Sequence, residues 1–411
     1  MKKTTSALAL AALVGSPAAA MATVEFGGDF DARYVVAQDG DRTADGDDDK
    51  RKGFQQRIRL QADFEADGGV SLHTRLNLFN DRWTGDASGN TSELDEQPFT
   101  TVARDHRNVA LDYGYVTMPL AGGTLSIGRM ISNWQFNLTT SDDRRDRIAY
   151  VAPLGGGHTG ILQYDRRQAA PESEGSSALD GNQVNLAFLG PLAAGASYGF
   201  LVAQWDAGSS GAGAEGHALR GATLVAPYIE GEAGDFDYRV GGHYIGGSRG
   251  GAFTEDTFVA YVAGGFQMTP EFKLDGQVLH AEDGTLIAGG YDTFSSMIHN
   301  SLDHDQSGIR VDDLNLGGSG TEAQSGWSRT LVAARGTFEM MDWTFIGALG
   351  WVDYDNDDAS EDIFFADAQA HYQLTPSTRV FGTAGYAEAD DGEVFDRDNY
   401  WATSLNVNVL F

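Results

Sequence analysis

Hydrophobic and polar positions alternate along much of the chain, and the alternation still runs at the last residue. In the closing segment one face carries Trp401, Thr403, Leu405, Val407, Val409 and Phe411, and the other carries Ala402, Ser404, Asn406, Asn408 and Leu410. A period of two is typical of a strand whose two faces meet different solvents. A closed membrane barrel has such a final strand, because its last strand pairs with its first and leaves no edge. We therefore expect 401–411 to close a barrel by pairing with 23–36.

Earlier segments repeat the pattern. In the second predicted strand Phe54, Ile58, Leu60, Ala62 and Phe64 oppose Gln55, Arg57, Arg59, Gln61, Asp63 and Glu65. The apolar face of this strand, and that of the next one after Asp67-Gly68-Gly69, carries no charged residue. This absence fits a lipid-facing surface, since a charge at the bilayer midplane costs ~2–4 kcal/mol.

Short turns and long polar loops alternate along the chain. Gly, Pro, Asp and Thr, which favour turns, predict short turns near 67–69, 120–123, 154–157, 191–194, 231–235, 269–271, 341–342 and 375–376. Long segments rich in Asp, Gly and Ser fall at 39–52, 84–107, 131–146, 168–181, 206–217, 247–256, 282–327, 354–362 and 389–397. The sequence thus predicts an all-β fold: a transmembrane antiparallel up-and-down β-barrel of 18 strands, with short periplasmic turns and long extracellular loops. The segment 147–153 is the weakest strand, and without it and a neighbour the barrel would have 16 strands.

Composition narrows the class of protein. Lys2 and Lys3, a short apolar stretch at 7–14, and Ala20-Met21-Ala22 predict a signal peptide over residues 1–22, followed by a single barrel domain over 23–411. No run reaches the ~20 apolar residues of a transmembrane helix. The chain has no cysteine, which excludes disulfides and thiolate metal sites. The net charge of -31 argues against nucleic acid as a partner, because phosphates would be repelled.

Large aromatic residues occur towards the predicted strand ends, where lipid–water interfaces lie. They are Tyr113, Tyr115, Trp205, Trp343, Trp351 and Trp401. We expect them to form the aromatic girdles of a membrane barrel.

One region resembles a known family. GGTLSIGRM (122–130), RIAYVAP (147–153), GGHTGILQYD and the terminal Phe411 look like the general porins of Gram-negative outer membranes. The resemblance implies a homotrimer of water-filled barrels, a third loop folded into the pore, and an arginine cluster facing acidic residues across the gap. Two features differ from the family: 18 predicted strands where it usually has 16, and a short segment after Arg129. The choice of constriction is therefore open between the third loop and the long acidic segment 282–327. Larger substrate-specific 18-strand channels are the close alternative.

The polar face of the strands is expected to line the lumen, where opposite charges filter small ions and polar solutes. The predicted pore-lining residues are Arg57, Arg59, His73, Arg75, Asp112, Arg239, Arg335 and Arg379, together with Asp29, Asp63 and Glu65. Asp142, Asp143, Arg144 and Arg145 are candidates for the charged tip of the following loop. Arg129 is carried over from the family, although Leu125 and Ile127 place it on the lipid-facing side unless a bulge re-aims it. The alternative is that each is an ordinary solvated residue without a filtering role.

The acidic loops also suggest a metal site. Asp303, Asp305, Ser307 and Gly308 resemble the opening of a calcium loop, with Leu314 where a bidentate Glu is needed. A hydrated, self-repelling loop is the alternative reading, and divalent ions bridging to lipopolysaccharide phosphates are another. The G-x-S-x-G match at 195–199 opens a strand and is followed by no predicted helix, so it does not predict a hydrolase.

These features predict a channel and no enzyme, located in the cell outer membrane. The leading hypothesis is a porin that passes small hydrophilic solutes and ions, with weak cation preference from the acidic loops and no resident cofactor besides the calcium candidate. Outer-membrane lipid and lipopolysaccharide are its expected partners. The alternatives are a substrate-selective channel or exporter and, less favoured, a barrel-embedded hydrolase or a structural sleeve.

Overall fold

The computed structural model describes residues 23–41, 49–82, 109–168, 181–193, 195–207, 221–246, 256–282, 285–288, 290–298, 327–356, 360–389 and 397–411. The first strands are β1 (Thr23–Asp41), β2 (Asp49–Ala66), β3 (Val70–Arg82), β4 (Ala110–Leu120), β5 (Gly123–Trp134), β6 (Thr140–Gly155), β7 (His158–Gln168), β8 (Gly181–Ala193) and β9 (Ala196–Ala207). They continue with β10 (Thr223–Ala233), β11 (Phe236–Gly246), β12 (Thr257–Thr269), β13 (Phe272–Ala281), β14 (Ser328–Met340), β15 (Trp343–Asp355), β16 (Ser360–Thr375), β17 (Thr378–Ala389) and β18 (Arg397–Leu410). Within these ranges no helix is long and apolar enough to cross a bilayer.

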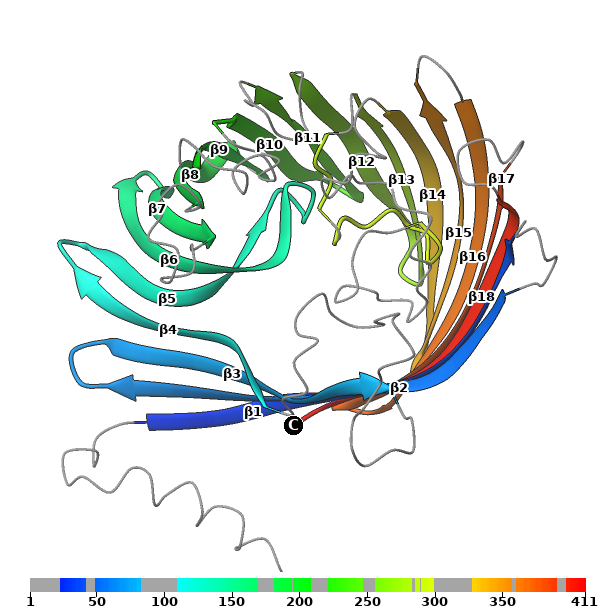
Figure 1. Ribbon diagram of the computed structural model, residues 1–411, viewed down its shortest axis with the longest axis horizontal. Helices are drawn as coiled ribbons and strands as arrows, with labels where there is room; N and C mark the ends of the chain where they lie inside the picture. Colours follow the sequence, from blue (N-terminus) through cyan, green and yellow to red (C-terminus); the bar gives the residue numbers. More distant parts are fainter. Residues whose placement is uncertain are drawn as a thin grey trace, which may run out of the picture.

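The strands form one closed antiparallel barrel (Figure 1). Each strand pairs with its neighbours in sequence, and β18 pairs with β1. The predicted β-barrel of 18 strands is confirmed, and the 16-strand alternative is wrong, because the doubtful segment 147–153 lies inside β6. The eight predicted short turns are confirmed as the connections between strands, whereas the predicted loop 131–146 is mostly strand.

Closure of the barrel depends on the C-terminal strand. Asp29 to Asp41 of β1 pairs with Arg397 to Leu410 of β18. The last residue continues the ladder, since the Phe411 amide donates to the Gly28 carbonyl at 3.1 Å and the Phe411 main-chain oxygen accepts from the Gly28 amide at 2.8 Å. The prediction that the closing strand pairs with the first one is confirmed. Its register differs, because residues 23–27 pair with β2 and extend beyond β18.

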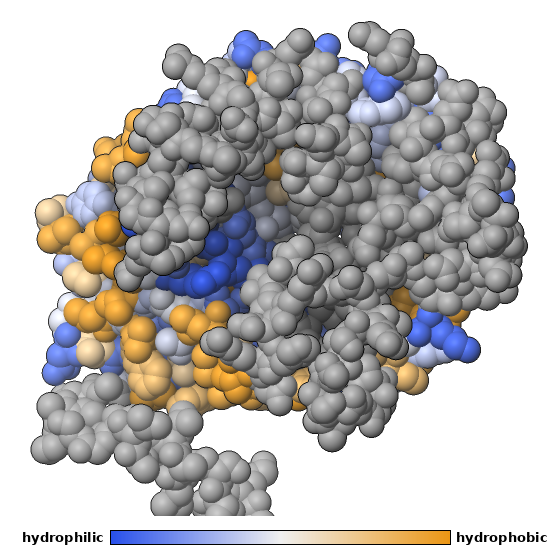
Figure 2. Space-filling view, in the orientation of Figure 1, coloured by the Kyte–Doolittle hydropathy of each residue, from blue (hydrophilic) through white to orange (hydrophobic). Residues whose placement is uncertain are grey.

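The alternation along each strand separates an apolar exterior from a polar lumen. Phe26, Val262 and Leu405 are 56%, 55% and 58% exposed on the outer face. Arg57 and Asn406, on the opposite parity, are only 9% and 4% exposed. Figure 2 shows hydrophilic side chains inside the hollow and hydrophobic ones along the visible outer rim. Alternate side chains along each strand therefore face lipid and water, as the two sides of a membrane barrel require.

The predicted aromatic girdle is only partly correct. Trp343, Trp351 and Trp401 lie on the outer face and are partly exposed there. Tyr113 and Trp205 are instead buried on the lumen side, 8% and 5% exposed, and Tyr115 stacks on His73 with ring centroids 4.9 Å apart. Inside the barrel Tyr113 lies beside Arg75, and Trp205 belongs to a hydrophobic cluster with Leu201 and Leu224. The spacing of aromatics along the sequence does not reveal these contacts.

The β5–β6 hairpin leaves the barrel wall near its middle. Pairing of β4 with β5 ends at Gly114 and Arg129, and pairing of β6 with β7 ends at Asp146 and Arg166. Beyond these residues β5 and β6 pair only with each other, from Met130 opposite Arg145 to Trp134 opposite Thr140. In Figure 1 their ends reach across the lumen towards β10 and β11. Residues 130–145 are called the inner hairpin below.

A second segment inside the barrel packs on the inner hairpin. The backbone amide of Ala288 donates to the carbonyl of Leu138 at 2.7 Å, and the fully buried Leu138 joins a core cluster with Ile287 and Tyr291. Further along, Met297 contacts β17, where a Cβ at Gly385 would lie 2.8 Å from the Met297 side chain. Of the predicted constriction 282–327, the parts at 285–288 and 290–298 therefore lie within the barrel. The inner hairpin lies there too, so both segments enter the lumen, and which of them constricts the pore stays a prediction.

Candidate functional site

A belt of ion pairs begins on β1 and β2. Arg57 donates to Asp31 at 2.9 Å, and Arg59 donates to Asp29 at 2.8 Å. The residues of each pair lie directly opposite one another in the β1–β2 register, and all four face the lumen. Directly opposed cross-strand pairs are held by the backbone ladder, so these guanidinium groups have fixed positions.

The belt continues through Asp112 to the inner hairpin. Asp112 sits in a bulge of β4, because Arg75 pairs with Tyr113 while the next residue of β3 pairs with Leu111. The bulge turns both Asp112 and Tyr113 inward, where the Asp112 carboxylate accepts from Arg75 and, at 2.7 Å, from Arg144. The Arg75 guanidinium also lies 4.8 Å from the Tyr113 ring. One carboxylate therefore ties the barrel wall to the hairpin that crosses the lumen.

The opposite face of the inner hairpin carries a second, more buried cluster. Asp165 of β7 is fully buried and accepts from Arg147 at 2.5 and 2.8 Å and from Arg145 at 3.1 Å. The Asn185 amide donates to the same carboxylate at 2.9 Å, and the Gln183 amide donates to Asn185 at 2.7 Å. The carboxylate thus accepts four hydrogen bonds, one at Oδ1 and three at Oδ2, which compensates the burial of its charge.

Acids and bases compensate one another along the whole belt. The arginines are Arg57, Arg59, Arg75, Arg144, Arg145 and Arg147, and their partners are Asp29, Asp31, Asp112, Asp142, Asp143 and Asp165. Partners come from adjacent strands or from the hairpin itself. Because each guanidinium lies next to a carboxylate, their electric fields cancel over short distances. The predicted transverse field across the pore stays a prediction.

The other predicted lumen residues also lie on the inner face. His73 contacts Asp63 at 2.7 Å, Arg239 lies 4.8 Å from the ring of Phe136, and Arg379 lies 5.0 Å from the ring of Phe381. Arg335 pairs with Asp292 at 2.7 Å and stacks on Phe294 at 4.0 Å. Glu65 shares this parity near the short-turn end. Arg239 and Arg335 thus contact the two segments that lie inside the barrel, which no local pattern indicated.

Arg129 is the exception, and its assignment to the pore is wrong. It is exposed on the outer face, opposite Gly114 and Asp146 in the register. The alternation through Ile127 continues unbroken to Arg129, so no bulge re-aims it. Asp146 and Arg166 are exposed in the same row and pair in the β6–β7 register. The row marks the outer end of the apolar belt on this side of the barrel.

Sequence reasoning missed Arg147, Asp165, Gln183 and Asn185. A usable signal existed, since Arg145 and Arg147 share a parity and Asp165 shares that parity on the following strand. The sequence predicted a loop over 131–146, so no strand pairing was expected for Arg145. The shared parity of these residues therefore went unnoticed.

The tip of the inner hairpin has a strained backbone that is anchored on the far wall. Gln135, Phe136 and Asn137 have φ of 58°, 54° and 67°, a left-handed turn that costs ~1–2 kcal/mol per non-glycine residue. The Gln135 amide donates to the carbonyls of Pro227 at 2.7 Å and Gly242 at 2.8 Å. Strain of this kind persists only where surrounding contacts fix it, and it clusters at functional sites.

Further contacts join the tip to the second inner segment. The His243 ring nitrogens contact the hydroxyls of Thr139 at 3.2 Å and Thr285 at 3.3 Å. Tyr291 donates to Gln277 of β13 at 2.8 Å, and burial raises the pKa of the Tyr291 hydroxyl well above its ordinary value. It therefore remains a neutral hydrogen-bond donor. Together these contacts hold both segments inside the lumen as one rigid partition.

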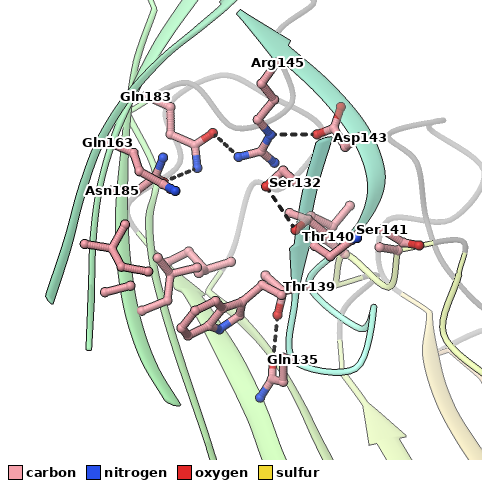
Figure 3. A pocket seen from close by; sticks show the side chains of 18 of the residues that line it. Ser132, Gln135, Thr139, Thr140, Ser141, Asp143, Arg145, Gln163, Gln183 and Asn185 are labelled. Atoms are coloured by element: carbon pink, nitrogen blue, oxygen red, sulfur yellow. Dashed lines mark hydrogen bonds and ion pairs between the residues drawn. The ribbon is translucent and has the colours of Figure 1, made fainter. Parts of the chain in front are cut away.

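A cavity of about 470 Å³ lies between the inner hairpin and the wall formed by β6–β10 (Figure 3). Gln163, Gln183, Asn185, Ser132 and Ser141 contribute polar groups to its lining. Trp134, Trp205, Tyr228, Leu201, Leu224 and Leu286 contribute the apolar part. The volume falls within the ~300–1,000 Å³ of ordinary small-molecule sites.

The metal and catalytic candidates find no structural support. Asp303, Asp305 and Ser307 lie outside the described residues, so their proposed calcium site stays a prediction. Within the described ranges no group of three or more acidic or histidine side chains could hold a metal ion. Gly195 of the G-x-S-x-G match lies in the turn that opens β9 and leads into a strand, without the strand-to-helix elbow that a hydrolase needs.

Comparisons with known proteins agree with the barrel. A BenF-like porin from Pseudomonas fluorescens Pf-5 has a TM-score of 0.60 at 9% identity, covering 94% of this chain and 99% of that chain. OccK9 (OpdG) of Pseudomonas aeruginosa has a TM-score of 0.60 at 12% identity, covering 94% and 98%. OccK2 (OpdF) of the same organism, in complex with glucuronate, has a TM-score of 0.59 at 12% identity, covering 94% and 98%. At such identities the likeness concerns the fold alone.

No curated protein matches the chain. A family model for Gram-negative porins, however, matches residues 7–392, which is nearly the whole sequence. Taken with the closed 18-strand barrel and its polar lumen, this match shows that the chain belongs to the Gram-negative porin family.

Proposed function

We propose that this outer-membrane porin passes small hydrophilic solutes and ions passively, and that the inner hairpin sets the size limit. The observation that carries the proposal is the polar, ion-paired lumen crossed by residues 130–145 and packed against 285–298. A fixed partition in a water-facing barrel narrows the path without a moving part. Passage then depends on solute size and on contacts with the belt of charges.

Planar-bilayer recording tests this proposal. Purified protein should insert in discrete steps and give a current that rises linearly with voltage. Gln135→Ala removes the amide that anchors the hairpin tip, and Gln369→Ala, on β16, is the matched control. The proposal predicts larger current fluctuations for Gln135→Ala only. A barrel that folds but conducts no ions contradicts the proposal.

The ion preference follows from the balance of charge. Because the described arginines and aspartates of the belt compensate one another, the acidic external loops decide the sign, and we expect weak cation preference. A reversal potential measured across a salt gradient tests this. A potential that favours anions refutes it.

Several finer features belong to the same proposal. The porin resemblance supports a homotrimer, and the apolar N-terminal stretch supports removal of residues 1–22 as a signal peptide. The exposed row of Arg129, Asp146 and Arg166 on the outer face supports contact with lipopolysaccharide phosphates. Chemical cross-linking, N-terminal sequencing and lipopolysaccharide binding by Arg129→Ala test these three features separately. A monomer would contradict the homotrimer, and an uncleaved N-terminus would contradict the signal peptide. Unchanged lipopolysaccharide binding would contradict the contact at Arg129.

A substrate-selective channel is the second candidate, and one observation favours it. The cavity behind the inner hairpin has both polar and apolar lining residues, as solute-binding sites do. Saturable inhibition of ion current by one class of solute would support selectivity. Current that falls only in proportion to the loss of bulk conductivity would support simple diffusion.

A further inference from the structure

The cavity behind the inner hairpin is lined by charges that are already neutralised. Arg145 donates to Asp143 at 2.9 Å and to Asp165 at 3.1 Å, and Arg147 donates twice to Asp165. Two guanidinium groups therefore face two carboxylates, and both arginines are nearly fully buried. A solute carboxylate placed here would meet no uncompensated positive charge, and it would be repelled by Asp143. The charge pattern favours an uncharged ligand.

The polar groups left for a ligand are side-chain amides. Among the described residues no side chain hydrogen-bonds to Gln163, which lines the cavity and is half-buried. An amide offers two donors and one acceptor oxygen, and a hydroxyl both donates and accepts. Gln183 and Asn185 stand beside Gln163 (Figure 3), with their orientation fixed by the Asp165 network. Such groups match neighbouring hydroxyls of a polyol, each of which also donates and accepts.

The opposite side of the cavity presents rigid aromatic rings. The Trp134 indole N–H donates to the Ala226 carbonyl at 3.1 Å, which fixes the ring, and Tyr228 packs edge-on to it with centroids 5.6 Å apart. Trp205 lines the same cavity and is 5% exposed. Aromatic faces bind the C–H faces of a ring-shaped solute through apolar contact, and the polar edge of Trp134 is already engaged by the Ala226 carbonyl.

We propose that this cavity is a binding site for a neutral sugar, with the hydroxyls on the amide side and the ring face on the tryptophan side. The inference rests on the proposed porin function, because the sugar reaches the site from the lumen. It deepens that function by naming a solute class, since a site beside the inner hairpin retains passing sugars for longer.

Current recordings with glucose and glucuronate as probes test the site, because these solutes differ by one carboxylate. Wild-type channels should show saturable current reduction with glucose, and glucuronate should need at least ten-fold higher concentration. Gln163→Leu removes one ligand hydrogen bond and should raise the half-blocking glucose concentration about 3- to 10-fold. Gln369→Leu, the same substitution on the far wall of the lumen, should leave it unchanged.

Tryptophan fluorescence gives a readout that does not require conduction. A glucose-dependent change that saturates at the half-blocking concentration, and shifts in Gln163→Leu, supports the site. Normal conduction without saturable glucose block or fluorescence change overturns the sugar site and leaves the porin function intact. Tighter block by glucuronate than by glucose overturns the choice of a neutral ligand. A fluorescence response in a barrel that does not conduct supports the site and overturns passive passage.

Discussion

Replacement of Asp165 by asparagine is expected to destabilise the barrel strongly, because this carboxylate neutralises two buried guanidinium groups. It is 0% exposed and accepts hydrogen bonds from Arg145, Arg147 and Asn185. Asparagine keeps the shape but not the charge. Among the described residues Arg145 retains the carboxylate of Asp143, whereas Arg147 retains the Ser132 hydroxyl at 3.2 Å but no carboxylate. Removing one partner of a buried pair costs about 3–5 kcal/mol.

A matched variant separates this effect from a simple loss of lumen charge. Asp63→Asn also removes one inward-facing carboxylate, but the pair of Asp63 with His73 has side chains 31% and 29% exposed. An exposed pair contributes about 0–1 kcal/mol. Each tenfold change in the folded-to-unfolded ratio corresponds to about 1.4 kcal/mol, so the two variants should differ by at least tenfold.

Denaturant unfolding of the refolded barrel in detergent, followed by tryptophan fluorescence, measures both free energies. Asp165→Asn should lower the unfolding midpoint well below that of Asp63→Asn, with both below or equal to wild type. Equal midpoints for the two variants would refute the reasoning, since they would show that water or rearrangement replaces the lost charge. Restored stability in Asp165→Asn combined with Arg147→Met would support it, because both partners of the pair are then absent.

Three further variants test the fold and the lumen. Val262→Arg places a charge on the lipid-facing side of β12 and should destabilise the inserted barrel by ~2–4 kcal/mol, measured as a lower denaturant midpoint in lipid vesicles; an unchanged midpoint would place this face away from lipid. Deletion of Phe411 removes the final backbone pair with Gly28 and should reduce membrane assembly while export continues, as seen by cell fractionation; normal assembly would count against it. Arg144→Gln removes the cation that pairs with Asp142. The reversal potential should then indicate a stronger preference for cations, and a stronger preference for anions would contradict the charge balance.

The sequence by itself determined the architecture, because its period-two pattern is a local property. Alternation fixes which side chains face lipid, and Gly, Asp and Pro mark the turns, so the number of strands follows from counting. The lumen face of Arg57, Arg59 and Arg75 follows in the same way. A membrane barrel also forces closure, since an unpaired strand edge in lipid is costly.

Only the tertiary structure decided how the lumen is divided. Whether residues 130–145 stay in the wall or cross to β10 depends on contacts between Gln135 and the carbonyls of Pro227 and Gly242, which lie more than ninety positions away in sequence. Arg144 shares a parity with the outward-facing Asp146, yet it faces the lumen because the hairpin has turned inward. Long-range packing of this kind produces no periodic pattern in the sequence, so it cannot be predicted from alternation. The cavity beside the hairpin therefore forms only when the hairpin packs against the far wall.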